Sequence, residues 1–292
     1  FSIVYSPALQ PSIMTSSDPN AFVFYRYHPS LIAAAIFVAC FAITTLLHIS
    51  QAARARTYYF IPLIIGGLLE CIGYVGRALA HNDETDMSIF IMQTLTILVA
   101  PALFAASIYM ILGRIVLATR GESVAPIRAS RLTKIFVCGD VVAFLVQAGG
   151  GGLMAQQKTQ NSGKFIVLGG LFIQIIFFGI FVITSSIFHK RLAGSPTQES
   201  LAVPWQKYMF ALYSASLLIL IRSVFRVIEF AGGNTGPLES SEVYLYVFDA
   251  ILMLGVMVGF NIVHPGAIIG RKAQKDNILL SDRESGRGGP NY

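Results

Sequence analysis

The chain has 292 residues, of which 54% are hydrophobic and only 12% are charged. Soluble domains carry roughly 25% charged residues, so this composition excludes an ordinary soluble domain and indicates an integral membrane protein. The formal net charge is +6, but most of the basic residues lie beside apolar stretches, so the charge is no sign of nucleic-acid binding.

Seven apolar stretches follow one another along the chain. Each is long enough to cross the hydrocarbon core of a bilayer, which takes about 20 helical residues. They cover residues 29–50, 59–80, 88–117, 133–154, 165–188, 208–230 and 243–263. Their periodicity is helical or uniformly apolar, without the alternating ten-residue segments of a membrane β-barrel. We therefore predict an all-α integral membrane protein whose seven transmembrane helices form one domain, residues 29–266.

Prolines and glycines mark particular positions in these spans. Pro29 and Pro62 suit the first turn of a helix, where a missing N–H leaves no bond unmade, and Pro265 closes the seventh span. Pro101 falls inside the third span and is expected to kink that helix. Residues 149–152 are four glycines in a row, where either the fourth helix ends or two backbones approach closely.

Basic residues near the ends of the spans predict the orientation of the chain. One side of the bundle carries most of them, at Arg54, Arg56, Arg114, Arg120, Arg128, Arg131, Lys134, Lys190, Arg191, Lys207, Arg271, Lys272 and Lys275. The other side carries several acids, at Asp83, Glu84, Asp86, Glu239 and Glu242. The positive-inside rule therefore places residues 1–28 outside and residues 267–292, a polar tail expected to be disordered, in the cytoplasm.

Charged residues also occur inside the spans. At mid-bilayer each costs roughly 2.5–3.5 kcal/mol on insertion scales, so such residues need a partner or a wet cavity. Arg222, Arg226 and Glu229 follow each other at helical spacing and share one face. Counting residues along the helices puts three acids and three bases in the outer half of the membrane, namely Glu70, Arg77, Arg222, Arg226, Glu229 and Asp249.

Two interpretations of these charges stay open: salt bridges that hold the bundle together, or a polar cavity, open toward the outer leaflet, that accepts a charged head group. Buried ion pairs are weak evidence for stability, which favours the second interpretation. The predicted substrate-binding residues are Glu70, Tyr74, Arg77, Gln93, Gln147, Arg222, Arg226, Glu229 and Asp249. Glu70 and Asp140 are candidates for proton coupling. No catalytic residue, metal or cofactor is predicted.

Two other functions share these features. A seven-helix lipid sensor or receptor would have the same topology, which does not specify function. A membrane metallo-hydrolase of lipid amides could bind zinc through His48, His189, His264 and Asp140, although no HExxH pair is present. No Walker A sequence occurs, so ATP hydrolysis by that device is excluded.

The order and spacing of several motifs extend over nearly the whole predicted membrane domain. They are YHPS at 27–30, GGLLECIGYVGR at 66–77, QTLTILVAPALFAASIYMILGR at 93–114, GD…Q…GGGG at 139–152, RSVFRVIEF at 222–230, YLYVFD at 244–249 and HPG at 264–266. With these motifs the chain resembles the RTA-like lipid-translocating exporter family of fungi.

The resemblance implies a seven-helix protein with its amino terminus outside, linked to resistance to toxic amphiphiles. Members of the family are associated with sphingoid long-chain-base export, aminosterol resistance, phospholipid asymmetry and protoporphyrin uptake. We therefore expect translocation or export of amphiphilic lipids, with a lipid and the bilayer as partners. The location expected first is the plasma membrane, with an internal membrane as the alternative.

Overall fold

The computed structural model describes residues 29–82, 86–154, 159–232 and 242–266, and every regular element in those ranges is a helix. The predictions for residues 1–28 and 267–292 lie outside the described residues. Seven helices are long and apolar enough to cross a membrane, which confirms the predicted all-α, seven-span fold. Large apolar side chains cover their outer surfaces, among them Ile32, Leu145 and Phe165, as lipid-facing positions require.

The first three spans lie between Leu31 and Ala118. They are α1 (Leu31–Ala55), the short 3-10 turn η1 (Tyr58–Phe60) with α2 (Ile61–Ala80), and α3 (Met87–Ala118). After the turn η2 (Gly121–Ser123) come α4 (Ala129–Met154), α5 (Gln160–Gly194), the short α6 (Gln198–Ala202) and α7 (Trp205–Gly232). The seventh span is continuous and consists of α8 (Glu242–Leu245), the π-helical segment η3 (Tyr246–Ala250) and α9 (Ile251–Ile262).

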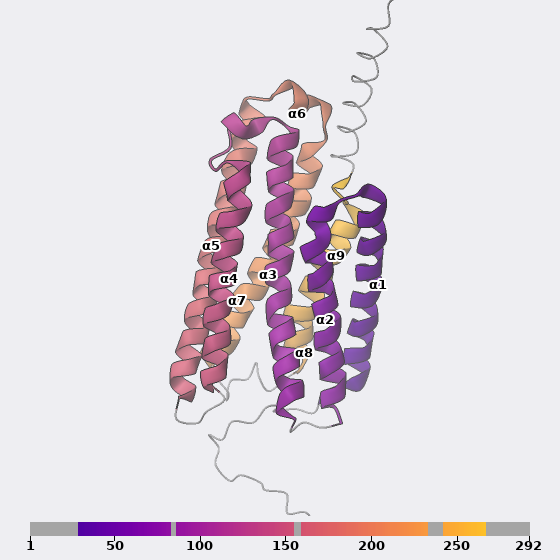
Figure 1. The fold of residues 1–292 in the computed structure, drawn as a ribbon, viewed down its shortest axis with the longest axis vertical. Helices are drawn as coiled ribbons and strands as arrows, with labels where there is room; N and C mark the ends of the chain where they lie inside the picture. The colour runs from indigo at the N-terminus through magenta and orange to yellow at the C-terminus, as the bar shows by residue number, and fades with distance from the viewer. Residues whose placement is uncertain (1–28, 83–85, 155–158, 233–241, 267–292) are drawn as a thin grey trace, which may run out of the picture.

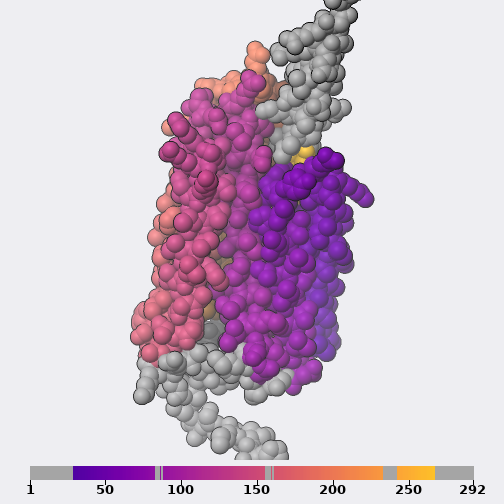
Figure 2. Space-filling view, viewed as in Figure 1, coloured from indigo at the N-terminus to yellow at the C-terminus, as the bar shows by residue number. Residues whose placement is uncertain are grey.

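Helices that follow each other from α1 to α5 pack side by side, and α7 and α9 close the bundle behind them (Figure 1). α7 contacts α3 and α5, while α9 contacts α7 and α1. α3 is the most enclosed of the seven spans. Figure 2 shows the face that the side chains of α1 to α4 form. This arrangement brings α2, α7 and η3 together beside α3, and α2, α7 and η3 carry most of the buried charges.

The prolines behave differently at the two predicted helix starts. Pro62 lies in the first turn of α2, as expected. The expectation for Pro29 is wrong, because α1 begins at Leu31 and Ser30 is its N-cap. The Ser30 hydroxyl accepts from the Ala33 N–H, which a proline cannot do, and serine is among the strongest N-cap residues.

The four glycines at 149–152 do not end their helix, since α4 continues to Met154. Only one of the four meets another backbone. A Cβ built on Gly150 would lie 2.7 Å from the Val167 amide nitrogen and 2.8 Å from the Gly163 carbonyl oxygen of α5, whereas at Gly149, Gly151 and Gly152 it would meet nothing within 4 Å. Gly150 therefore permits the close approach of α4 and α5, as small residues do at interfaces between membrane helices.

This difference predicts opposite effects for two neighbouring substitutions. Gly150→Ala is expected to destabilise the protein by about 1–3 kcal/mol, because the new methyl group overlaps the α5 backbone. Gly151→Ala is expected to stabilise it by up to about 1 kcal/mol, because alanine favours a helix and its methyl group points into open space. Thermal unfolding of both variants in one detergent measures the difference. Equal shifts in the two variants would show that Gly150 makes no close backbone contact.

Candidate functional site

The arginines of α7 share one carboxylate of η3. Asp249 Oδ1 accepts from Arg222 Nε, and Asp249 Oδ2 accepts from Arg226 Nη2 at 2.9 Å. Arg226 Nη1 also donates to Glu229 Oε2 at 3.0 Å. Arg222 and Asp249 are almost fully buried, at 2% and 1% exposure. The predicted shared face of α7 is confirmed, and its two positive charges are held by two acids.

The position of Asp249 depends on the π-helical segment. In η3 the Ile251 N–H donates to the Tyr246 carbonyl, so this part of the span has a wider turn than the α-helices on either side. π-helical turns are rare and occur often at functional sites. Here the wide turn carries both Tyr246 and Asp249, which belong to the two charge networks of the protein.

A proline on α3 provides a further partner for Arg222. In a regular helix the N–H of residue 101 would donate to the Ile97 carbonyl, but Pro101 has no N–H. Arg222 Nη2 donates to that carbonyl instead, at 2.9 Å. α3 runs on through Pro101, and a kink there stays a prediction. The effect that the structure does show is a hydrogen bond between α3 and α7.

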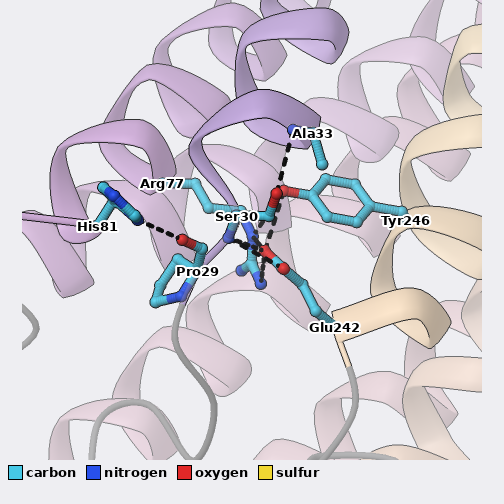
Figure 3. A network of polar contacts seen from close by, with 7 residues as sticks. All are labelled: Pro29, Ser30, Ala33, Arg77, His81, Glu242 and Tyr246. Atoms are coloured by element: carbon cyan, nitrogen blue, oxygen red, sulfur yellow. Dashed lines mark hydrogen bonds and ion pairs between the residues drawn. The ribbon is translucent and has the colours of Figure 1, made fainter.

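A second network of polar contacts involves Ser30, Arg77, Glu242 and Tyr246 (Figure 3). Arg77 Nε and Nη2 both contact Glu242 Oε1 at 3.0 Å. Glu242 also accepts from the Ser30 N–H, at 3.0 and 3.1 Å to its two oxygens, and from the Tyr246 hydroxyl at 3.1 Å. The His81 ring nitrogen Nδ1 lies 2.8 Å from the Pro29 carbonyl oxygen. We call Ser30, Arg77, Glu242 and Tyr246 the latch, because they join α1, α2 and α8.

Glu242 is missing from the predicted site, although it is the acid that pairs with Arg77. Sequence analysis placed it among the acids outside the membrane, because it precedes the seventh apolar stretch. The pair could have been suspected from depth, since Arg77 and Glu242 both lie at the same end of their spans. Arg77 lies seven residues after Glu70 on α2, and Glu242 lies seven residues before Asp249, so the latch lies about 10 Å further along the bundle than Glu70 and Asp249.

Aromatic rings fill the space between the two networks. Tyr74 stacks on Phe41 with ring centroids 5.5 Å apart, and Tyr246 stacks on Phe37 at 5.0 Å. The Tyr74 and Tyr246 rings are 6.0 Å apart. Tyr74 is fully buried and its hydroxyl has no hydrogen-bond partner among the described residues.

Glu70 is the acid for which the described residues offer no partner. It is 0% exposed, and neither of its carboxylate oxygens has a hydrogen bond. It lies within electrostatic reach of Asp249, Arg222 and Arg226. Glu242 adds a fourth acid to the three acids and three bases counted from the sequence: it pairs with Arg77, Asp249 and Glu229 pair with the α7 arginines, and Glu70 is left over. We call Glu70, Arg222, Arg226, Glu229 and Asp249 the charge cluster.

The other residues predicted for substrate binding or proton coupling, Gln93, Gln147 and Asp140, lie on α3 and α4 rather than on the helices of the charge cluster. Gln93 is buried on α3, one turn before Ile97, and packs against Gly76 of α2. Gln147 donates to Gln174 at 3.1 Å between α4 and α5, outside the charge cluster. Asp140 accepts from the Tyr109 hydroxyl at 2.8 Å, also away from the cluster.

The histidines considered for zinc binding have separate partners. His48 Nε2 lies 2.9 Å from the Met257 carbonyl oxygen, His264 Nε2 lies 3.2 Å from the Thr57 hydroxyl, and His189 Nδ1 lies 3.2 Å from the Tyr213 hydroxyl. In the described part of the chain, no three His, Cys, Asp or Glu residues gather in a way that could hold a metal ion. The geometry therefore gives the metallo-hydrolase alternative no support.

The family model described as "RTA1 like protein" matches residues 63–272, which include every charge of the cluster. The chain belongs to this RTA1-like family. It is 35% identical to "Protoporphyrin uptake protein 1" of Saccharomyces cerevisiae, over 85% of this chain and 93% of that protein. It is 37% identical to "Protein RTA1" of the same yeast, over 84% and 86% of the two chains.

A more distant relative of this RTA1-like protein is named for its substrate. The chain is 25% identical to "Sphingoid long-chain base transporter RSB1" of Saccharomyces cerevisiae, over 89% of this chain and 77% of that protein. No solved structure matches the chain. The seven spans and these relatives together identify a multi-pass membrane protein in a family with members named as transporters.

The shared carboxylate predicts a large stability effect. Asp249→Asn leaves Arg222 and Arg226 facing each other with Glu229 as their only bonded acid among the described residues. Breaking a buried pair from one side costs about 3–5 kcal/mol, so we expect strongly reduced unfolding stability and accumulation in detergent.

A double-mutant cycle is the control. Asp249→Asn combined with Arg222→Gln removes both partners and should recover part of the loss. Strictly additive losses in the double variant would contradict direct coupling between the two side chains.

Proposed function

We propose that this RTA1-like protein translocates amphiphilic lipids with a charged head group across the membrane, and that Glu70 exchanges a proton for the positive charge of the substrate. The proposal extends what the names of the relatives suggest, since one is called a sphingoid base transporter and a sphingoid base carries an amine. A protoporphyrin, named in another relative, is also an amphiphile, but its carboxylates are negatively charged, so the proton exchange proposed here concerns amine head groups.

The observation that carries the proposal is a set of buried polar atoms without partners at one place. They are both carboxylate oxygens of Glu70, the Tyr74 hydroxyl and Arg226 Nε, and all four lack a hydrogen bond within the described residues. Buried polar atoms are nearly always satisfied, so a group of unsatisfied ones calls for an explanation. A polar head group would supply the acceptor that Arg226 Nε lacks and the donors that Glu70 lacks.

Counting the charges of the cluster explains why a proton would leave as a positively charged head group binds. With Glu70 protonated, the charge cluster contains two positive and two negative side chains and is neutral. If an ammonium head group binds as the proton leaves, the total charge of the site is unchanged. Such an exchange avoids placing a net charge in a low-dielectric interior, which is the largest obstacle to charged groups in a membrane. An ammonium group that entered the site without release of a proton would place one uncompensated positive charge in that interior, at the full electrostatic cost.

The latch gives the site a closed end. Arg77, Glu242 and Ser30 tie three helices together about 10 Å beyond the cluster, between it and the side expected to be outside. A cavity open toward the outer leaflet therefore stays a prediction, and opening it requires these bonds to separate. In this scheme the latch opens when the head group leaves on the outer side.

The test measures movement of a labelled sphingoid base between the leaflets of proteoliposomes at several pH values. Glu70→Gln should accumulate like the unaltered protein, because Glu70 makes no hydrogen bond to lose, yet transport should fall about tenfold or more and lose its pH dependence. Glu122→Gln, an exposed acid in η2, is the matched control and should leave transport unchanged.

Two outcomes would contradict the proposal. Unchanged transport in Glu70→Gln would remove Glu70 from the site. Saturable binding of the sphingoid base without any movement in the unaltered protein would favour a lipid sensor over a transporter.

A further inference from the structure

A groove lies between α7 and α9 in the half of the bundle away from the latch. It has a volume of about 420 Å³. Ligand sites in proteins typically occupy about 300–1,000 Å³, so the groove is large enough for part of a lipid. Its floor is apolar and buried, with Val256 and Phe260 each 1% exposed. Its rim includes Phe210 at 64% and Ile262 at 75% exposure, so it opens on the lipid-facing surface.

Small residues on both helices create the groove. Ser214 lines it from α7, and Gly255 and Gly259 line it from α9. A Cβ built on Gly259 would meet nothing within 4 Å, so the space there is left by an absent side chain. In a bilayer, an apolar recess on the lipid-facing surface of the bundle is filled by hydrocarbon, because lipid chains surround that surface.

A positive charge stands at one end of the groove. Lys207 lines it, is exposed, and has no ion pair among the described residues. Lys207 belongs to the basic side of the protein, which is expected to face the cytoplasm. The cytoplasmic leaflet carries the anionic lipids, and a lysine at its surface attracts their head groups. The groove thus combines an apolar recess with one cation at head-group depth.

We propose that this groove binds one anionic phospholipid of the bilayer, with an acyl chain between α7 and α9 and its phosphate at Lys207. The site is separate from the charge cluster: along α7 the groove reaches Leu218, and Arg222 follows one turn later, where its bond to Asp249 closes the space between the helices. This proposal goes beyond the transport function and does not depend on it, because the groove can hold a lipid whether or not the protein moves one.

Photolabelling in nanodiscs tests the proposal. The unaltered protein is embedded in phosphatidylcholine containing a trace of phosphatidylserine with a diazirine in its acyl chain, and labelled peptides are found by mass spectrometry. Label should concentrate on peptides of α7 and α9 that line the groove. The same photolabel on phosphatidylcholine should give about fivefold less, because it lacks the net negative charge that Lys207 attracts.

Three variants locate the lipid. Gly259→Leu places an apolar side chain in the groove, at a position where a built Cβ meets nothing within 4 Å, and should abolish the concentrated label. Gly169→Leu is its matched control, since Gly169 of α5 is also exposed with nothing within 4 Å of a built Cβ, and it should change nothing. Lys207→Gln should lower phosphatidylserine labelling about fivefold and leave phosphatidylcholine labelling unchanged.

Several results would overturn the proposal. Label spread evenly over all exposed faces would mean annular lipid contact only. Equal labelling by the two lipids, or labelling unaffected by Lys207→Gln, would exclude an anionic head group. Label absent from the groove of the unaltered protein would exclude a lipid bound there. If Gly259→Leu fails to fold, Ser214→Leu fills the same groove from α7.

Discussion

The carboxylate of Asp249 between Arg222 and Arg226 is the contact on which the rest of the buried charge depends. The two arginines are four residues apart on one helix, and their repulsion is far stronger in a membrane interior than in water. A single acid bonded to both removes most of that repulsion, and Glu229 assists on the same helix. Because the acid comes from η3, this contact also fixes α7 against the seventh span.

Other features of the fold follow from keeping these arginines buried. The π-helical turn places Asp249 where it meets both of them. Pro101 leaves the Ile97 carbonyl without a helical donor, and Arg222 takes that place. Arg77 has its own acid in Glu242, so it does not draw on the charge cluster. Glu70 is then the one acid of the charge cluster without a basic partner, and it is buried with no hydrogen bond in the described residues. The proposed proton exchange takes place at this carboxyl group.

Sequence reasoning predicted the seven spans and the shared face of the α7 charges, because span length, helical spacing and the cost of buried charge are local properties. It missed what depends on contacts between helices. From the sequence, Glu242 is assigned to a loop, whereas in the structure it begins α8 and pairs with Arg77. Pro29 is expected in the first turn of α1, but Ser30 caps that helix because its hydroxyl accepts from the Ala33 N–H. No local pattern in the sequence marks the π-helical turn, and only packing shows that Gly150, unlike Gly149, Gly151 and Gly152, meets α5.

The charge state of Glu70 is the central claim, and infrared spectroscopy of the purified protein measures it most directly. If Glu70 is the surplus acid and carries a proton, the spectrum of the unaltered protein contains a carboxylic-acid C=O band that disappears in Glu70→Gln. The same band should remain in Asp140→Asn, because Asp140 lies outside the charge cluster with Tyr109 as its partner. If the spectra of the unaltered protein and of Glu70→Gln show the same carboxylic-acid bands, Glu70 is ionised. That result would contradict both the charge count and the proton exchange based on it.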